Sequence, residues 1–315
     1  MASFADRCLV DSLASIVNLK CLNPESQNTY TPADIVSLMD NEMSLIVVPL
    51  LKSVKQDYFV YNVDIPIVNG QSSYTFPTRA IGNAVKDVVL LDASGNEVAL
   101  NNLEREYIKV QFPFNFVPSI WSFGQYVSAN EINLYNTLIQ TYTAYTLRFI
   151  TERRPNGLVL SESCGQITAI TGNVLTLSNV DATWTTATTF DIVNQLPPFQ
   201  SIVDDATVTD ITGQQVTLTT VPAGLARGQW VCPAMLSCIP QIPYELFPLL
   251  TELAVAALSE GLDMSQLLAS AKAKIELYAS NSAKLTRPRV SGSPKLIINK
   301  SGMGRGFGGM GGGWR

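Results

Sequence analysis

The side chains that could do chemistry in this 315-residue chain are carboxylates and thiols, because the sequence contains no histidine. The missing histidine excludes Ser-His-Asp and Cys-His catalysis, imidazole ligands for a metal ion and a histidine pH switch. Asp204 and Asp205 are adjacent carboxylates, and such a pair can serve in a metal site or in acid–base catalysis. They stand between expected strands in a stretch of loop composition, so we expect a solvated turn there.

The cysteines show no metal-binding or disulfide pattern. They are Cys8, Cys21, Cys164, Cys232 and Cys238. The count is odd and no two form a CxxC motif, whereas disulfide frameworks and zinc sites usually show even or closely paired sets. We therefore expect reduced, mostly buried thiols in a protein made in the cytosol, with no zinc site and no cofactor.

Arg79 is a single charge within the otherwise uncharged stretch from Tyr74 to Gly82. An arginine in such surroundings commonly binds loop carbonyls or a carboxylate through its planar fork of donors. We therefore expect Arg79 to order a loop.

The composition indicates a folded protein with a charge asymmetry. Hydrophobic residues make up 46% of the chain and charged residues 15%, which excludes a chain that is disordered throughout. Seven basic residues and no acidic one lie between Lys284 and Arg315; removing these seven positive charges from the net charge of −5 leaves −12 for residues 1–283. An acidic body with a basic C-terminal arm indicates an acidic partner for the arm. Residues 301–315 contain eight glycines among arginine and aromatic residues, a pattern typical of a flexible docking tail or of a segment that binds single-stranded nucleic acid.

The N-terminal residues follow helical spacing. Apolar positions predict a short helix over 12–22 and a second one from Thr31 to about Ile46. Thr31 can cap the second helix because its hydroxyl accepts from a free backbone amide, and we expect Pro49 to end or kink this helix.

The C-terminal third returns to helical spacing. It predicts one helix over 244–258, with Gly261 as its C-cap, and another over about 263–285. The most apolar stretch, 246–258, is too short to cross a bilayer, and the N-terminus does not have the pattern of a signal peptide. We expect no membrane association.

The middle of the chain is rich in β-branched and aromatic residues, with turn residues between them. Strand–turn–strand patterns predict a hairpin over 88–100 and a strand over 142–150. Residues 167–180 match residues 208–221 without gaps, with seven of fourteen positions identical, and each copy predicts a hairpin with a glycine turn.

These patterns together predict an α+β fold. The helices of the N- and C-terminal segments form one bundle, and the β-rich region is a large barrel-like or sandwich-like insertion, followed by an extended C-terminal arm. The expected boundaries are 1–57 for the N-terminal helices, 58–240 for the insertion, 241–285 for the C-terminal helices and 286–315 for the basic arm.

Two stretches of the sequence resemble a known family. The first is Tyr74-x-Phe-Pro-x-Arg79-Ala-Ile-Gly82, followed by Lys86-Asp87-Val88. The second follows the C-terminal helix pair and reads Arg289-Val290-x-Gly292-Ser293-Pro294-Lys295-x-Ile297-x-Asn299. In this order they resemble the head-to-tail connector proteins, also called adaptor or neck proteins, of tailed bacteriophages.

The resemblance implies a structural virion protein without catalytic residues, metal or cofactor. It implies a homo-oligomeric, dodecameric ring beneath the portal protein of the capsid, in which the helical bundle forms the ring body and the β domain faces outward or toward a tail protein. The ring would continue the channel for DNA without sequence-specific binding, at the capsid–tail junction of a virion assembled in the bacterial host cytoplasm. The C-terminal arm would dock on the portal through Arg287, Arg289, Lys295, Ile297 and Lys300.

Other functions fit parts of the same pattern. The β-rich centre suits another tail or baseplate subunit equally well. Trp121, Trp184 and Trp230 could form a sugar-binding platform, although core or interface packing is commoner for such residues. An enzyme would need a carboxylate pair or a Ser/Lys pair, and the sequence shows no such spacing.

Overall fold

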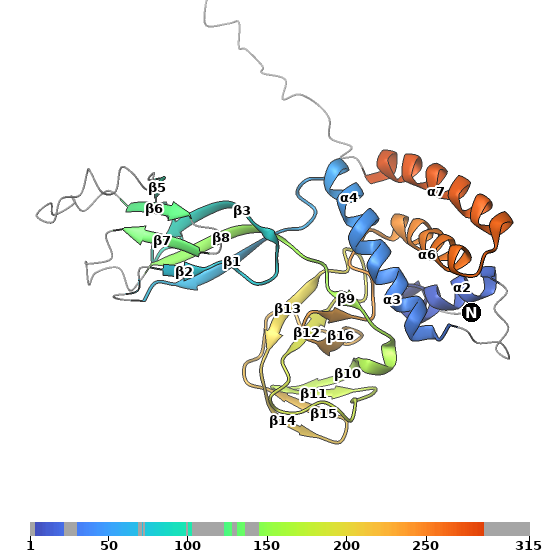
Figure 1. The fold of residues 1–315 in the computed structure, drawn as a ribbon. Coiled ribbons are helices and arrows are strands. Elements are labelled where there is room, and N and C mark those ends of the chain that lie inside the picture. Colours follow the sequence, from blue (N-terminus) through green and yellow to red (C-terminus); the bar gives the residue numbers. More distant parts are fainter. Residues whose placement is uncertain are drawn as a thin grey trace, which may run out of the picture.

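The computed structural model describes residues 4–21, 30–68, 71, 73–98, 100–102, 123–127, 131–135 and 145–286. Helices from both ends of this part lie together, on the right of Figure 1. The residues between them form two separate β units, one below the helices and one to their left in the same view. The expected mixed α+β class is confirmed.

The N-terminal helices agree with the expected positions. They are α1 (Phe4–Arg7), α2 (Val10–Cys21), α3 (Pro32–Glu42), the π-helix η2 (Met43–Val47) and α4 (Val48–Val54). Thr31 caps α3 in a capping box, since its hydroxyl accepts from the amide of Asp34 while the Asp34 carboxylate accepts from the amide of Thr31. Pro49 does not end the helix. A wider π-turn precedes it, which accommodates the missing N–H, and helical structure continues to Val54.

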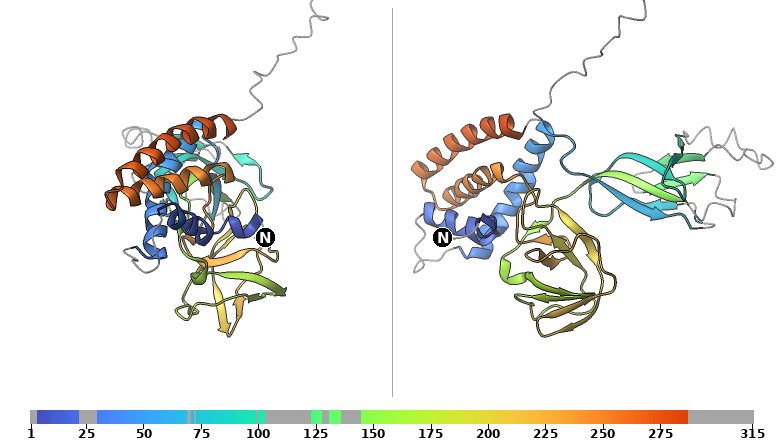
Figure 2. Two further views of the ribbon diagram at one scale, coloured as in Figure 1. Left: turned by 90° about the vertical axis from the view of Figure 1, so that its right-hand side faces the viewer. Right: turned by 180° about the vertical axis from the view of Figure 1, so that it is seen from behind.

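The C-terminal helices are η5 (Tyr244–Leu246), α6 (Phe247–Gly261) and α7 (Ser265–Thr286). Helix α6 packs against α2, α3 and α7, and Figure 2 shows these helices side by side. Helix α6 is therefore buried on almost every face, and helices from both ends contribute to one hydrophobic core. The sequence predicted Gly261 as a C-cap, but Gly261 is the last residue of α6 and Leu262 is the C-cap. The hydroxyl of Tyr30 lies 2.8 Å from the position that a Cβ of Gly261 would occupy, so the glycine makes room for a close contact. None of the described helices is long and apolar enough to cross a membrane.

The first β unit contains two four-stranded sheets. One has the order β1-β8-β3-β4, formed by β1 (Val60–Pro66), β8 (Thr146–Arg153), β3 (Ala80–Leu91) and β4 (Glu97–Val98). The other has the order β2-β7-β6-β5, formed by β2 (Ser73–Thr75), β7 (Glu131–Tyr135), β6 (Phe123–Val127) and β5 (Leu100–Asn102). Side chains of both sheets, including Tyr74, Ile132 and Phe149, form one hydrophobic core. The expected hairpin of β3 and β4 is confirmed.

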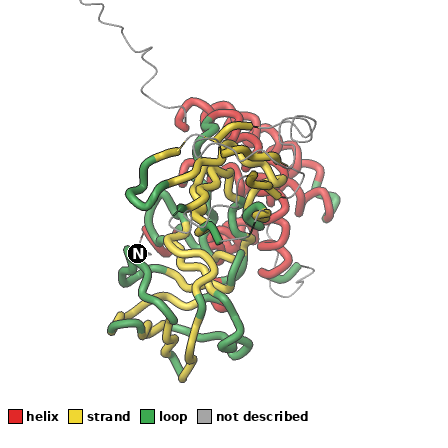
Figure 3. The backbone as a smooth tube through the Cα atoms, turned by 90° about the vertical axis from the view of Figure 1, so that its left-hand side faces the viewer, coloured by secondary structure: helices red, strands yellow, loops and turns green. Residues whose placement is uncertain are grey.

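The second β unit is one seven-stranded antiparallel sheet with a core of its own. In sheet order its strands are β13 (Ser201–Ala206), β12 (Phe190–Val193), β16 (Trp230–Pro233), β10 (Gly165–Thr171), β11 (Val174–Leu177), β15 (Gln215–Leu218) and β14 (Val208–Thr212). A short 3-10 helix, η4 (Ser161–Ser163), precedes it, and a parallel pair, β9 (Gly157–Leu158) and β17 (Leu236–Ser237), lies between the sheet and the helices. Strands and loops make up the lowest part of the molecule in Figure 3.

The barrel expectation is wrong for the described residues. The end strands β13 and β14 of the seven-stranded sheet do not pair with each other, so no sheet closes on itself in the described part. The region expected as a single insertion, 58–240, also contains two separate hydrophobic cores.

The repeated segments form two hairpins related by a local two-fold axis. Strands β11 and β15 pair antiparallel, and Leu175 lies opposite Val216, its own equivalent in the other copy. The contacts repeat as well: the amide of Leu177 donates to the carbonyl of Gln214 at 2.8 Å, and the amide of Leu218 donates to the carbonyl of Asn173 at 2.9 Å. The duplicated sequence therefore builds a symmetric four-stranded part of the seven-stranded sheet.

The two hairpin turns make a matched test of this symmetry. Gly172 and Gly213 have φ angles of 60° and 58°, and no atom lies within 4 Å of either missing Cβ. Gly172→Ala and Gly213→Ala should each lower the free energy of unfolding by about 1 kcal/mol, since only the left-handed backbone opposes the new methyl group. Thermal and urea unfolding measure the loss, with exposed Thr171→Ala as control; a loss at only one of the two turns would contradict the symmetry.

Candidate functional site: a buried ion cluster between the β units

Arg79 lies at the centre of a buried cluster of charged groups. It stands in the turn before β3 and is 4% exposed. Its two terminal nitrogens donate to the two carboxylate oxygens of Asp191 at 2.6 and 2.8 Å, which is a bidentate ion pair. Arg79 belongs to the first β unit and Asp191 to β12 of the second, so this pair joins the two units.

Asp205 completes the coordination of Arg79. Its carboxylate accepts from Nε at 3.1 Å and from a terminal nitrogen at 2.6 Å. Burial opposes the charged form of Arg79, but the hydrogen bonds to Asp191 and Asp205 raise its pKa above the usual value. The sequence predicted a solvated turn at Asp204 and Asp205, and this prediction is wrong, because both residues belong to strand β13. The backbone of Asp205 is left-handed, with φ of 53°, a conformation that aspartate tolerates better than most residues.

Asp191 is fully buried and receives five hydrogen bonds. Besides Arg79, the donors are the Asn156 side-chain amide at 2.6 Å and the backbone amides of Asp205 and Met235, both at 3.0 Å. Met235 also has a left-handed backbone, with φ of 65°. The Asp191 carboxylate therefore helps to hold two unfavourable backbone conformations in place.

Arg153 forms the second half of the cluster. One terminal nitrogen donates to Asp204 at 2.6 Å, to the Ser201 hydroxyl at 2.7 Å and to the Asn156 side-chain oxygen at 3.0 Å. Burial lowers the pKa of the Arg153 guanidinium from its usual value, and burial also raises the pKa of Asp204, which the two arginines oppose. Two arginines and three aspartates together carry one net negative charge.

The cluster also reaches the segment that leads into the C-terminal helices. The side chain of Gln241 accepts from the backbone amide of Asn156 at 2.9 Å and donates to the Ser201 hydroxyl at 3.0 Å. Gln241 is buried and lies just before η5. The same network thus contacts both β units and the start of the C-terminal helices.

Further contacts attach the helices to the β units. Asp40 on α3 accepts from the amide of Leu158 at 2.9 Å, and Asp11 on α2 accepts from the amide of Ser161 at 3.0 Å. Lys52 on α4 forms an ion pair with Glu152 on β8. These side chains come from three different helices, so the attachment is spread along the helical part.

This arrangement is chemically suited to holding parts together. A cleft of about 420 Å³ lies beside the cluster, lined by residues that include Tyr58, Tyr61 and Arg153. The five hydrogen bonds to the Asp191 carboxylate leave it no free lone pair to act as a base. Arg79 stays protonated at physiological pH, so it cannot act as a base either. We interpret the cluster as a rigid joint.

The other residues singled out in the sequence fall into two groups. Trp184 and Trp230 are each 8% exposed and pack in hydrophobic cores, so they do not present a surface for a sugar ring. Residues outside the described part are Trp121 and the expected docking residues Arg287, Arg289, Lys295, Ile297 and Lys300.

Sequence reasoning missed three members of the joint: Asp191, Arg153 and Asn156. One available signal was the position of Asp191 among the apolar residues Phe190, Ile192 and Val193. A carboxylate in an apolar strand requires a buried partner, and Arg79 was the isolated cation that needed one. Sequence spacing also failed to group Cys164, Cys232 and Cys238, which the fold brings together.

The joint is tested by comparing a buried and an exposed arginine. Arg79→Met removes the bidentate partner of the buried Asp191 and leaves only Arg153, at 3.8 Å, as a counter-charge, so it should lower the free energy of unfolding by about 3–5 kcal/mol. Arg148→Met removes a bidentate pair with Asp64 that is partly exposed, and should cost no more than about 1 kcal/mol. Urea unfolding measures both.

Arg79→Lys serves as a second variant, because it keeps the charge and loses the fork. Its stability should lie between wild type and Arg79→Met. If Arg79→Met loses no more stability than Arg148→Met, the joint does not hold the units together.

Comparisons with known proteins leave the family of this chain open. Neither the protein-family models nor the curated protein sequences include a match to this chain.

Proposed function

We propose that this chain is a structural virion protein, a subunit of the ring that connects the capsid portal to the tail of a tailed bacteriophage. The observation that carries the proposal is the joint. Arg79 belongs to the stretch that resembles connector proteins, and the same residue makes the buried pair with Asp191. A subunit that must hold separate domains at a fixed angle under load needs such a joint more than an open active site.

The exposed apolar side chains of the helices support a ring body made of helical bundles. Leu19 on α2 and Leu45 on η2 are 74% and 73% exposed, and neighbouring Ile16 and Ile46 are also exposed. Apolar side chains in the centre of a permanent subunit contact are typical of oligomers. In the proposed dodecamer, these helices contact the neighbouring subunits in a closed ring.

The charge distribution supports the proposed partners. Residues 1–283 carry a net charge of −12, so a channel formed by this body would repel DNA and let it pass without adhesion. The basic segment after Thr286, the last residue of α7, would dock on the portal by pairing its arginines and lysines with acidic groups there. A β unit would contact the tail protein on the opposite side of the ring.

Ring formation is tested by placing a charge on the helical surface. Leu45→Glu should prevent assembly while leaving the fold intact, because the new carboxylate would have to be desolvated in the subunit contact. Native mass spectrometry over a range of concentrations measures the assembly of wild type and variant. Val221→Glu changes an equally suitable exposed residue, 55% exposed in the seven-stranded sheet unit, and should assemble like wild type. A wild-type chain that stays monomeric at all concentrations would refute the ring.

Portal docking is tested by deleting the basic arm. A chain that ends at Thr286 should fold and assemble like the full chain but fail to co-purify with the portal protein of the same virus. A chain lacking only residues 302–315 keeps Arg287, Arg289, Lys295 and Lys300 and should still bind. Equal recovery of portal with the chain that ends at Thr286 would rule out the docking role.

A further inference from the structure

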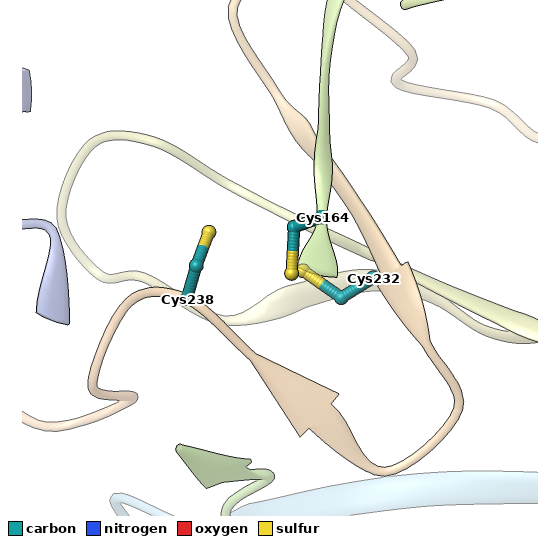
Figure 4. Close-up of side chains that lie close together, drawn as sticks. All are labelled: Cys164, Cys232 and Cys238. Atoms are coloured by element: carbon teal, nitrogen blue, oxygen red, sulfur yellow. The ribbon is translucent and has the colours of Figure 1, made fainter. Parts of the chain in front are cut away.

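Three of the five cysteines meet at one point of the fold. Cys164 follows η4, Cys232 lies in β16 and Cys238 follows β17. All three are fully buried, and their Sγ atoms all lie within 4.8 Å of one another (Figure 4). The other two cysteines are also buried and free: Cys8 lies in the turn between α1 and α2, and Cys21 is the last residue of α2.

The backbone holds each sulfur in place independently. The pairing of β10 with β16, in which Gly165 lies opposite Val231, brings Cys164 beside Cys232. The Ser237 hydroxyl accepts from the backbone amide of Ile239 at 3.1 Å and donates to the carbonyl of Ile239 at 2.6 Å. These two hydrogen bonds fix the turn that carries Cys238. The carbonyl of Cys238 also accepts from the amide of Val10 at the start of α2, at 2.9 Å. Cys164 is thus brought to two cysteines of a neighbouring strand and turn, and the backbone presents the three sulfurs in a preorganised arrangement.

The three thiols lie close enough to change one another's pKa. The hydrogen bond with Cys232 raises the pKa of Cys164, and burial raises the pKa of Cys238. Burial works against ionisation of Cys232 as well, but hydrogen bonds from the other two thiols lower its pKa to about 5. The thiolate is the form of cysteine that binds a metal ion, so a cation bound by these three sulfurs would displace their thiol protons.

The spacing and the donor type suit a thiophilic ion. A zinc–sulfur bond of about 2.3 Å places two sulfurs of a tetrahedral site about 3.8 Å apart, inside the observed limit. Thiolates are soft ligands, which favour zinc-like ions over calcium or magnesium. Three thiolates with one dication carry one net negative charge, a smaller buried charge than with a monovalent ion.

We propose that Cys164, Cys232 and Cys238 bind one thiophilic divalent cation of the zinc type. Three metal–sulfur bonds form, and the three thiol protons pass to solvent. The three cysteines belong to the hydrophobic core shared with the helices, so the ion would tie β10 and β16 to the segment that enters the C-terminal helices. This role is structural and does not depend on the proposed ring.

Zinc binding by the reduced full-length chain tests the proposal. After incubation with Zn²⁺ and removal of the excess, elemental analysis should find one zinc per chain. Cys164→Ser, Cys232→Ser and Cys238→Ser should each weaken zinc binding at least about 10-fold in competition with a chromophoric chelator. Cys8→Ser and Cys21→Ser also replace buried free thiols and should bind zinc like wild type.

Cobalt substitution keeps the test decisive if the cluster variants fail to fold. Wild type and the two control variants, loaded with Co²⁺, should show the absorption of thiolate-to-cobalt charge transfer, with one equivalent at saturation. Absence of this band in folded wild type would overturn the proposal. So would equal zinc affinity of the cluster variants and the controls, or a Cys164–Cys232 disulfide in place of bound metal under reducing conditions.

Discussion

The ion pair of Arg79 and Asp191 is the interaction on which the arrangement of the two β units depends. Removing both charges from water is costly, and such a pair is stable only when its remaining hydrogen-bonding capacity is satisfied. Asp191 meets that condition with five donors, and Arg79 meets it with a second carboxylate. Two of the donors are backbone amides of left-handed residues, Asp205 and Met235, so the turn after β16 and the end of β13 are built around the same carboxylate.

Apolar packing and polar bonding have separate tasks in this chain. Each β unit and the helical part have a hydrophobic core, which makes each part stable by burial of apolar surface. Burial is non-directional, whereas a forked ion pair works only over a narrow range of geometries. The hydrophobic cores therefore stabilise each part, and the joint sets the orientation of the two β units relative to each other. The cysteine cluster is next to it, since Asp191 lies opposite Cys232 in the pairing of β12 with β16.

Local signals in the sequence predicted the elements well. The cap at Thr31 and the two glycine turns of the repeat depend on neighbours within a few residues, and the structure has them as expected. Predictions failed where a distant contact intervened. Gly261 allows a close approach by Tyr30 instead of forming a C-cap. Asp205 lies in a strand, and its carboxylate binds Arg79, 126 residues away. The barrel was wrong because pattern alone does not tell whether hairpins close or divide into separate cores.

The sequence by itself determined the mixed α+β class, the duplicated hairpins, the lack of histidine chemistry and the contrast between an acidic body and a basic C-terminal segment. Periodicity, turn residues and composition carry that information directly, because each acts through neighbours along the chain. Only the tertiary structure decided that Arg79 meets Asp191, 112 residues away, and that Cys164 meets Cys232 and Cys238. Strand order and register set these meetings, and both arise from packing between segments far apart in the chain.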